Sequence, residues 1–81
     1  MEKKVRPICE IAREIRSSWG EKIYFGAKPY IAAMLSLNSI SDKYGLDDAD
    51  SIIRYFLANA SSWRGEDARR IKKELNSMLK S

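Results

Sequence analysis

Histidine is absent from this 81-residue chain, and cysteine occurs once, at Cys9. Without histidine, the chain lacks the side chain that most often acts as a general base near neutral pH and that often ligates zinc. The Cys9 thiol therefore has no histidine to activate it, and a lone cysteine forms no internal disulfide. Phosphate-binding loops, dinucleotide fingerprints and nucleophile elbows are also missing. The sequence predicts a protein that is not an enzyme and holds no metal or cofactor.

Long apolar runs are missing as well. No uncharged apolar stretch reaches the roughly 18 residues that a membrane span needs. Residues 1–6 are charged and lead into no apolar segment, so we expect no secretory signal. A chain that folds without disulfides suits a reducing compartment. We therefore expect a cytoplasmic protein with no membrane partner.

Glycine and proline are scarce, with four and two residues, and both prolines stand near predicted helix starts. This pattern favours helices over a fold of strands and turns. The length predicts a single domain over residues 1–81, with a stability of a few kcal/mol. The net charge of +4 comes from 15 basic and 11 acidic residues spread along the chain. Such a balance permits contact with nucleic acid or with an acidic protein and requires neither.

The longest uncharged stretch lies between Lys28 and Asp42. At about 100° per residue, its apolar positions cover more than half of a helix circumference. A helix of this kind must be covered from several sides. The sequence therefore predicts a central helix over 29–44, which starts at Pro29 and ends at Gly45, with Leu46 folded back onto its last turn.

Three other segments carry one apolar stripe each at helical spacing: 5–19, 47–61 and 66–80. Gly20 follows the first segment, Asp47 is a candidate N-cap of the second, and acidic residues lead the third. The predicted fold is all-α, a compact four-helix domain with the second helix central and the other three around it. Because the connections are short, consecutive helices should pack antiparallel or at steep crossings.

A Ser-Ser-Trp group occurs twice, at residues 17–19 and 61–63. Five similar residues are too few to establish a duplicated unit. We interpret the group as one device used at two helix ends, in which a tryptophan packs over the corner before a glycine turn.

The connector before the central helix contains Ile23, Tyr24 and Phe25, and Tyr30 follows Pro29. We expect the three consecutive apolar residues to pack under the first two helices, because a small domain needs every large side chain for its core. The alternative is that part of this segment stays exposed and anchors a protein partner. In that case the predicted partner-binding residues are Tyr24, Phe25, Lys28 and Tyr30, with Arg64, Arg69 and Arg70 as a charged rim.

A second group of basic residues suggests nucleic-acid binding through Lys28, Arg69, Arg70, Lys72 and Lys73. The segments 47–61 and 66–80 would then imitate a helix-turn-helix pair. However, Glu66 and Asp67 stand where such a motif reads bases, and their charge is wrong for phosphates. A solvated helix face explains the same residues.

Aromatic and small residues recur through most of the chain, in Trp19, Tyr24-Phe25-Gly26-Ala27-Lys28-Pro29-Tyr30, Met34, Asp42-Lys43-Tyr44, Tyr55-Phe56-Leu57-Ala58-Asn59-Ala60 and Trp63-Arg64-Gly65. In these positions the sequence resembles a family of small proteins encoded in phages and prophages of Gram-positive bacteria. The resemblance implies an origin in a phage genome and a location in the host cytoplasm. It implies no activity, cofactor or functional residue.

Three functions follow as hypotheses. The favoured one is a non-enzymatic phage accessory protein that binds another protein, such as a host defence or replication component. The second is nucleic-acid binding through the basic face of the last helix. The third is a structural homodimer that buries surplus apolar surface of the central helix.

Overall fold

A computed structural model describes residues 6–79 of the chain. Four helices make up most of this part: α1 (Ile8–Trp19), α2 (Lys28–Met34), α3 (Ala49–Ala58) and α4 (Glu66–Leu79). The connections contain two 3-10 turns, η1 (Gly20–Lys22) and η2 (Phe25–Ala27), and a small hairpin of β1 (Lys43–Tyr44) and β2 (Asp47–Asp48). The predicted mostly helical, compact domain is confirmed, with a two-stranded sheet added. The predicted helix ends at residues 5 and 80 lie outside the described residues.

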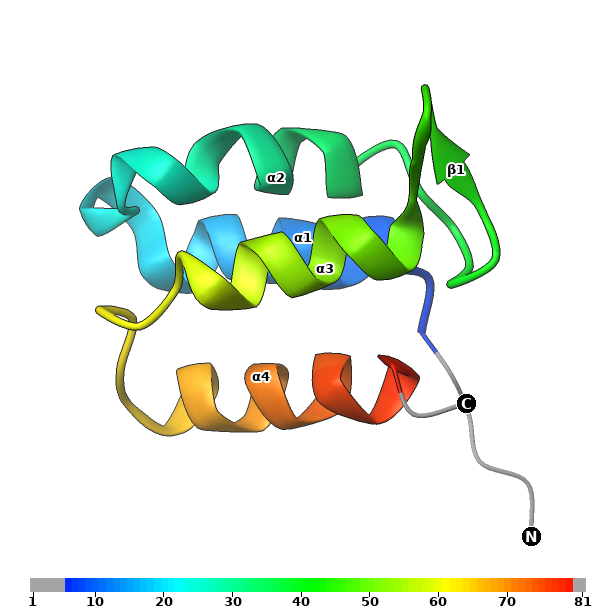
Figure 1. The fold of residues 1–81 in the computed structure, drawn as a ribbon. Coiled ribbons are helices and arrows are strands. Elements are labelled where there is room, and N and C mark those ends of the chain that lie inside the picture. The colour runs from blue at the N-terminus through cyan, green and yellow to red at the C-terminus, as the bar shows by residue number, and fades with distance from the viewer. Residues whose placement is uncertain (1–5, 80–81) are drawn as a thin grey trace, which may run out of the picture.

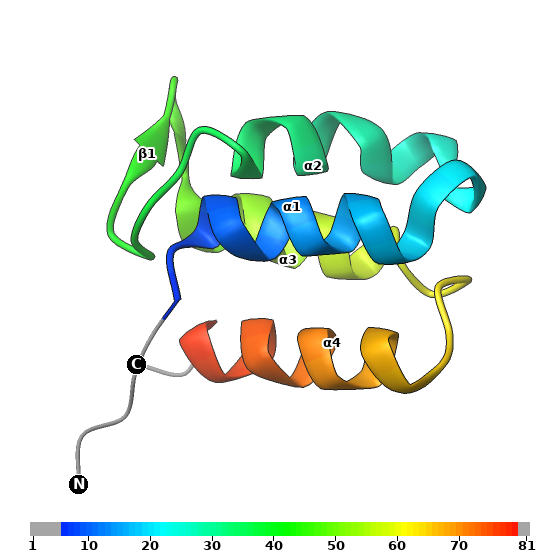
Figure 2. The ribbon, with the colours of Figure 1, turned by 180° about the vertical axis from the view of Figure 1, so that it is seen from behind.

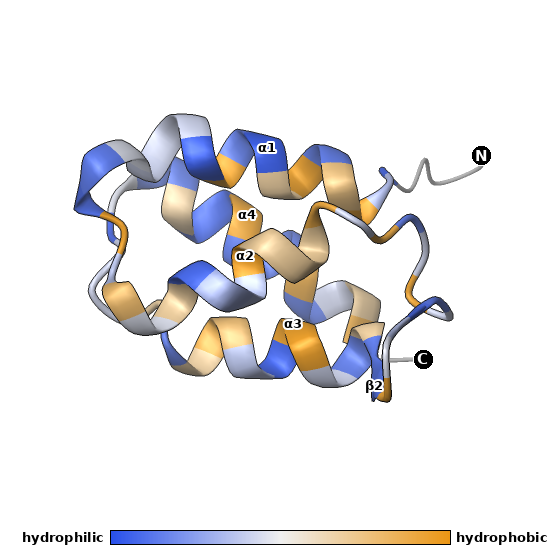
Figure 3. Ribbon diagram, turned by 90° about the horizontal axis from the view of Figure 1, so that it is seen from above, coloured by the Kyte–Doolittle hydropathy of each residue, from blue (hydrophilic) through white to orange (hydrophobic). Residues whose placement is uncertain are grey.

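Successive helices run in opposite directions (Figure 1). The helices α2 and α4 lie on opposite sides of α1 and α3, as the front, rear and top views show (Figures 1, 2 and 3). Both α2 and α4 pack against α1 and α3. The four helices thus enclose one core between them, and the prediction that the second helix is central is wrong.

The core is apolar and draws on every helix. Its fully buried large side chains are Ile8, Ile11, Ile15, Met34, Leu37, Ile53, Phe56, Ile71 and Leu75. They follow the predicted stripes, since each helix turns residues three and four positions apart toward the same side. No polar or charged residue within residues 6–79 is buried.

The helix predicted over 29–44 is wrong beyond Met34, where α2 ends. After Met34 the backbone tightens: the Ser36 N–H donates to the Ala33 carbonyl at 3.0 Å, and the Leu37 N–H donates to the Met34 carbonyl at 3.1 Å. Such three-residue spacing is the common way for a helix to finish. The chain then leaves the helical direction, although Leu37 itself stays buried in the core.

The segment after α2 satisfies the free N–H groups at the start of α1. The Ile8 N–H donates to the Asn38 carbonyl at 2.9 Å, and the Cys9 N–H donates to the Leu37 carbonyl at 2.8 Å. The first N–H groups of any helix need partners from outside it. Pro7 precedes α1 and offers no side-chain cap, so backbone carbonyls accept hydrogen bonds from these first N–H groups.

Side-chain competition for the backbone explains why the α2 helix gives way to this loop. The Asp42 carboxylate accepts hydrogen bonds from the N–H groups of Asn38 (2.9 Å) and Ser39 (3.1 Å). These bonds hold the pKa of Asp42 below its usual value, with the Ser39 N–H as the larger cause. Short polar side chains of this kind offer the backbone an alternative to helical hydrogen bonds. A helical wheel counts apolar faces and misses this competition.

Gly45 is not a helix cap but the first corner residue of the hairpin, in which Tyr44 pairs with Asp47. Its φ of +64° is left-handed, and no non-glycine residue in the described part has a positive φ. A positive φ at the first corner position alone fits a type II′ turn, the kind that joins two antiparallel strands. Leu46 therefore stands at the hairpin tip, 102% exposed, and does not fold back as predicted.

The bounds of α3 differ slightly from the prediction, whereas α4 starts at Glu66 as predicted. Asp48, not Asp47, precedes α3, and its side chain makes no capping hydrogen bond. The Ala49 N–H instead donates to the Asp42 carbonyl at 2.9 Å. The helix α3 ends at Ala58, three residues earlier than expected.

The two tryptophans of the repeated group stack on each other. The rings of Trp19 and Trp63 lie 5.3 Å apart at 14°, and Phe56 meets both edge-on at 6.3 and 6.4 Å. All three are buried, as the corner-packing interpretation requires. Gly20 and Gly65, with positive φ, turn the chain directly after each corner. This cluster joins the end of α1, the last turn of α3 and the approach to α4.

Replacing Trp63 by alanine should remove most of the stability of the domain. The loss should be about 3–5 kcal/mol, the usual cost of truncating a buried aromatic, which is comparable to the whole stability of so small a chain. Urea unfolding followed by circular dichroism measures it. Arg64→Ala, an exposed neighbour, is the control, and a Trp63→Ala loss below about 1 kcal/mol would contradict the packing described.

Candidate functional site

The connector between α1 and α2 presents two aromatic side chains to solvent. Phe25 is 83% exposed and Tyr24 is 52% exposed, whereas Ile23 is half-buried and Ala27 is fully buried. Ile23 and Ala27 therefore hold the segment against the core while the two rings stay outside. The expectation that all three consecutive apolar residues pack under the first helices is correct only for Ile23.

Gly26 lets the Tyr24 ring lie close to the end of α3. A Cβ at Gly26 would stand 2.7 Å from the Tyr24 ring and 2.8 Å from the Asn59 side-chain oxygen, closer than real Cβ contacts come. The other atom of that amide, Asn59 Nδ2, donates to the Tyr55 carbonyl at 2.9 Å. Only glycine fits here without a shift of its neighbours, so Tyr24 has a defined place beside α3.

Tyr30 of α2 and Tyr55 of α3 form a second aromatic pair, with ring centroids 5.6 Å apart at an angle of 40°. Tyr30 is half-buried, and Tyr55 is 50% exposed. Tyr55 was not among the predicted site residues, although its place off the apolar stripe of its helix was a usable signal. We call Tyr24, Phe25, Tyr30 and Tyr55 the aromatic surface.

The basic residues of α4 do not form a free face. Arg70 pairs with Glu14 of α1 at 2.5 Å and with Asp67 at 3.4 Å. The Lys72 ammonium donates to the Trp63 carbonyl at 2.7 Å and lies 6.0 Å from the centre of that indole. Burial, and secondly the charge of Arg64, hold the pKa of Lys72 below its usual value.

Arg69 and Lys73 are exposed and make no ion pair within residues 6–79. They lie on α4, across the bundle from α2 and Lys28 (Figure 1). The structure therefore does not gather the five basic residues of the nucleic-acid hypothesis on one face. It also separates Arg69 and Arg70, two of the three predicted rim residues, from the aromatic residues that precede and begin α2. The third, Arg64, is exposed in the turn before α4.

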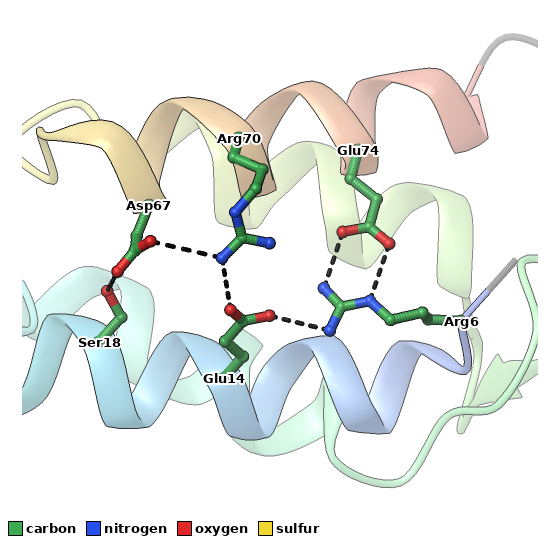
Figure 4. A network of polar contacts seen from close by, with 6 residues as sticks. All are labelled: Arg6, Glu14, Ser18, Asp67, Arg70 and Glu74. Atoms are coloured by element: carbon green, nitrogen blue, oxygen red, sulfur yellow. Dashed lines mark hydrogen bonds and ion pairs between the residues drawn. The ribbon is translucent and has the colours of Figure 1, made fainter.

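Arg70 belongs to an ionic network that joins α1 to α4 (Figure 4). Arg6 contacts both carboxylate oxygens of Glu74, at 2.7 and 3.0 Å, and pairs with Glu14 at 2.8 Å. Glu14 thus lies between two guanidinium groups. Hydrogen bonds from Arg70 first, and from Arg6 second, hold the pKa of Glu14 below its usual value. The network has a structural use, because it holds α1 and α4 together.

Cys9 is half-buried, and its thiol donates to the side-chain oxygen of Asn38 at 3.7 Å. Within residues 6–79, no three side chains of His, Cys, Asp or Glu gather as a metal site would require. In the same part of the chain, no helix is both long and apolar enough to cross a membrane.

The chain matches none of the family models, curated proteins or solved structures with which we compared it. The phage resemblance therefore stays a prediction. A functional proposal has to rest on the surface of the chain itself.

The ionic network makes stability depend on pH in a defined direction. The pKa of Glu14 is lower in the folded chain than its ordinary value of 4.5. The ionised Glu14 therefore stabilises the folded chain fully at pH values above 4.5, and this stabilisation is lost as the pH falls through the pKa of the folded chain. Glu14→Gln should lower stability at neutral pH by about 1 kcal/mol. The unfolding free energy of the variant should also fall less steeply than that of wild type between about pH 6 and about pH 3.

Urea midpoints across that range measure this effect. Glu10→Gln, an exposed acid on the same helix with no ion pair within the described residues, is the control. Equal pH slopes for wild type and Glu14→Gln would contradict the network.

Proposed function

We propose that this chain is a non-enzymatic protein-binding module, an accessory protein of a phage that acts on a host defence or replication component. The observation that supports it is the exposure of Phe25, 83%, next to Tyr24, 52%. Partner recognition uses large aromatic side chains more than any other apolar kind.

Because Phe25 stays in water, the fold gains none of the stabilisation that burying this side chain would give. Burying a phenylalanine side chain is worth about 1.5–3 kcal/mol, and a chain of this size has only a few kcal/mol of stability. Tyr24 and Tyr55 keep polar hydroxyl groups, so they tolerate half-exposure on their own. A partner that covers Phe25 supplies the missing burial.

The structure weakens the support for the other two hypotheses. Among the four basic residues of α4, Arg70 and Lys72 are already engaged inside the fold. The homodimer hypothesis relied on surplus apolar surface of a long central helix. That helix ends at Met34, and its buried residues Ile31, Ala33 and Met34 serve the domain's own core.

Phe25→Ser should abolish capture of the partner without unfolding the domain. The immobilised full chain is incubated with lysate of a Gram-positive bacterium, in one sample with and in another without nuclease treatment of the lysate. The bound protein is then quantified by mass spectrometry. Loss of a central aromatic anchor should lower recovery by about tenfold or more.

Leu46→Ser is the matched control, because it removes an apolar side chain that is even more exposed than Phe25, at the hairpin beyond the other end of α2 (Figure 1). Recovery that Phe25→Ser leaves unchanged would refute the proposed anchor. Recovery that disappears with nuclease would favour nucleic-acid binding instead.

A further inference from the structure

A groove of about 290 Å³ lies beside α2, lined by Arg16, Ile23, Lys28, Ile31, Ala32 and Leu35. Ile23 and Lys28 flank the η2 turn that carries Phe25, so the groove and the aromatic surface share one connector. Its lining combines apolar side chains with two cations. The apolar part consists of half-buried Ile23 and Leu35, buried Ile31 and small, exposed Ala32.

The charges at the groove have one sign. Arg16 and Lys28 are exposed, neither joins an ion pair within the described residues, and no acid lines the groove. Elsewhere the arginines Arg6, Arg54 and Arg70 each have a carboxylate partner. Arg69 and Lys73 on α4 are likewise exposed and unpaired within residues 6–79, but Arg16 and Lys28 are the two that lie at the apolar depression.

We infer that this groove takes an apolar side chain from an acidic segment of the partner protein, whose carboxylates pair with Arg16 and Lys28. The inference rests on the proposed function, since it states the chemistry of the partner that covers Phe25. The apolar side chain displaces water from Ile23, Leu35 and Ala32. The two cations then fix the orientation of the segment and favour acidic over neutral sequences.

Other occupants fit less well. Small-molecule sites are usually about 300–1,000 Å³ and enclosed, whereas this groove of about 290 Å³ stands at the lower limit of that range and is open to solvent. Its lining offers no aromatic ring on which a nucleic-acid base would stack. A second copy of the chain also carries a net charge of +4 and would bring like charges together.

A random peptide display library panned on the immobilised full chain tests the inference. We expect enrichment of peptides in which an apolar residue is flanked by Asp or Glu. Ala32→Leu fills the groove from the exposed side of α2 and should weaken these peptides by about tenfold. Lys28→Glu should weaken them by about fivefold or more.

Two controls match these variants. Lys73→Glu makes the same charge change on α4, and Asn76→Leu places the same side chain, leucine, on that helix; both positions are exposed and lie across the bundle. Neither should change peptide binding. Urea midpoints equal to wild type show that each variant is folded.

Several results would overturn the inference. They are failure to enrich any peptide, enrichment of basic or purely apolar peptides, and binding that Ala32→Leu leaves unchanged. A micromolar homodimer abolished by Ala32→Leu would assign the groove to a second copy. Binding of a labelled oligonucleotide abolished by Lys28→Glu would assign it to nucleic acid.

Capture from the lysate separates this inference from the proposed function. If Phe25→Ser loses the captured partner while Ala32→Leu keeps it, this inference fails and the proposed function stands. If both variants keep the partner, the inference and the proposed function both fail.

Discussion

The stack of Trp19 on Trp63 is the interaction on which the rest of the molecule depends. With Phe56 it closes one end of the bundle, where α1 and α3 end and the chain approaches the start of α4. Gly20 turns the chain away directly after the stack. The connector that carries Tyr24 and Phe25 starts from this fixed corner, so the packing of the core decides where the aromatic surface stands.

The opposite end of the bundle is closed by backbone hydrogen bonds rather than by rings. Carbonyl groups of the loop after α2 receive the first N–H groups of α1, and the Asp42 carboxylate holds that loop in shape. The Asp42 carbonyl also receives the first N–H group of α3. One short loop thus supplies hydrogen-bond partners to the starts of α1 and α3. These bonds explain why the apolar stretch after Met34 forms a loop and does not extend α2.

The sequence predicted the helices α1, α3 and α4 well because each has one apolar stripe and a readable boundary. It failed for α2, where periodicity continued past Met34 while local bonds to Asp42 ended the helix. It also missed the hairpin, since Gly45 suits both a helix cap and a type II′ turn. Within the candidate site, the sequence identified Tyr24 and Phe25 as candidate residues. It could not predict that they are exposed, because their exposure depends on how Ile23 and Ala27 pack. The internal use of Arg70 and Lys72 depends on partners distant in sequence.

The central claim is that the chain keeps one phenylalanine for its core and presents the other. Phe25 and Phe56 are its only phenylalanines, and their exposures are 83% and 0%. Solvent paramagnetic relaxation of the phenylalanine ring protons, measured by NMR with a soluble gadolinium chelate, compares them within one sample. The account predicts strong relaxation of the Phe25 ring and almost none of the Phe56 ring. Equal protection of both rings would contradict it.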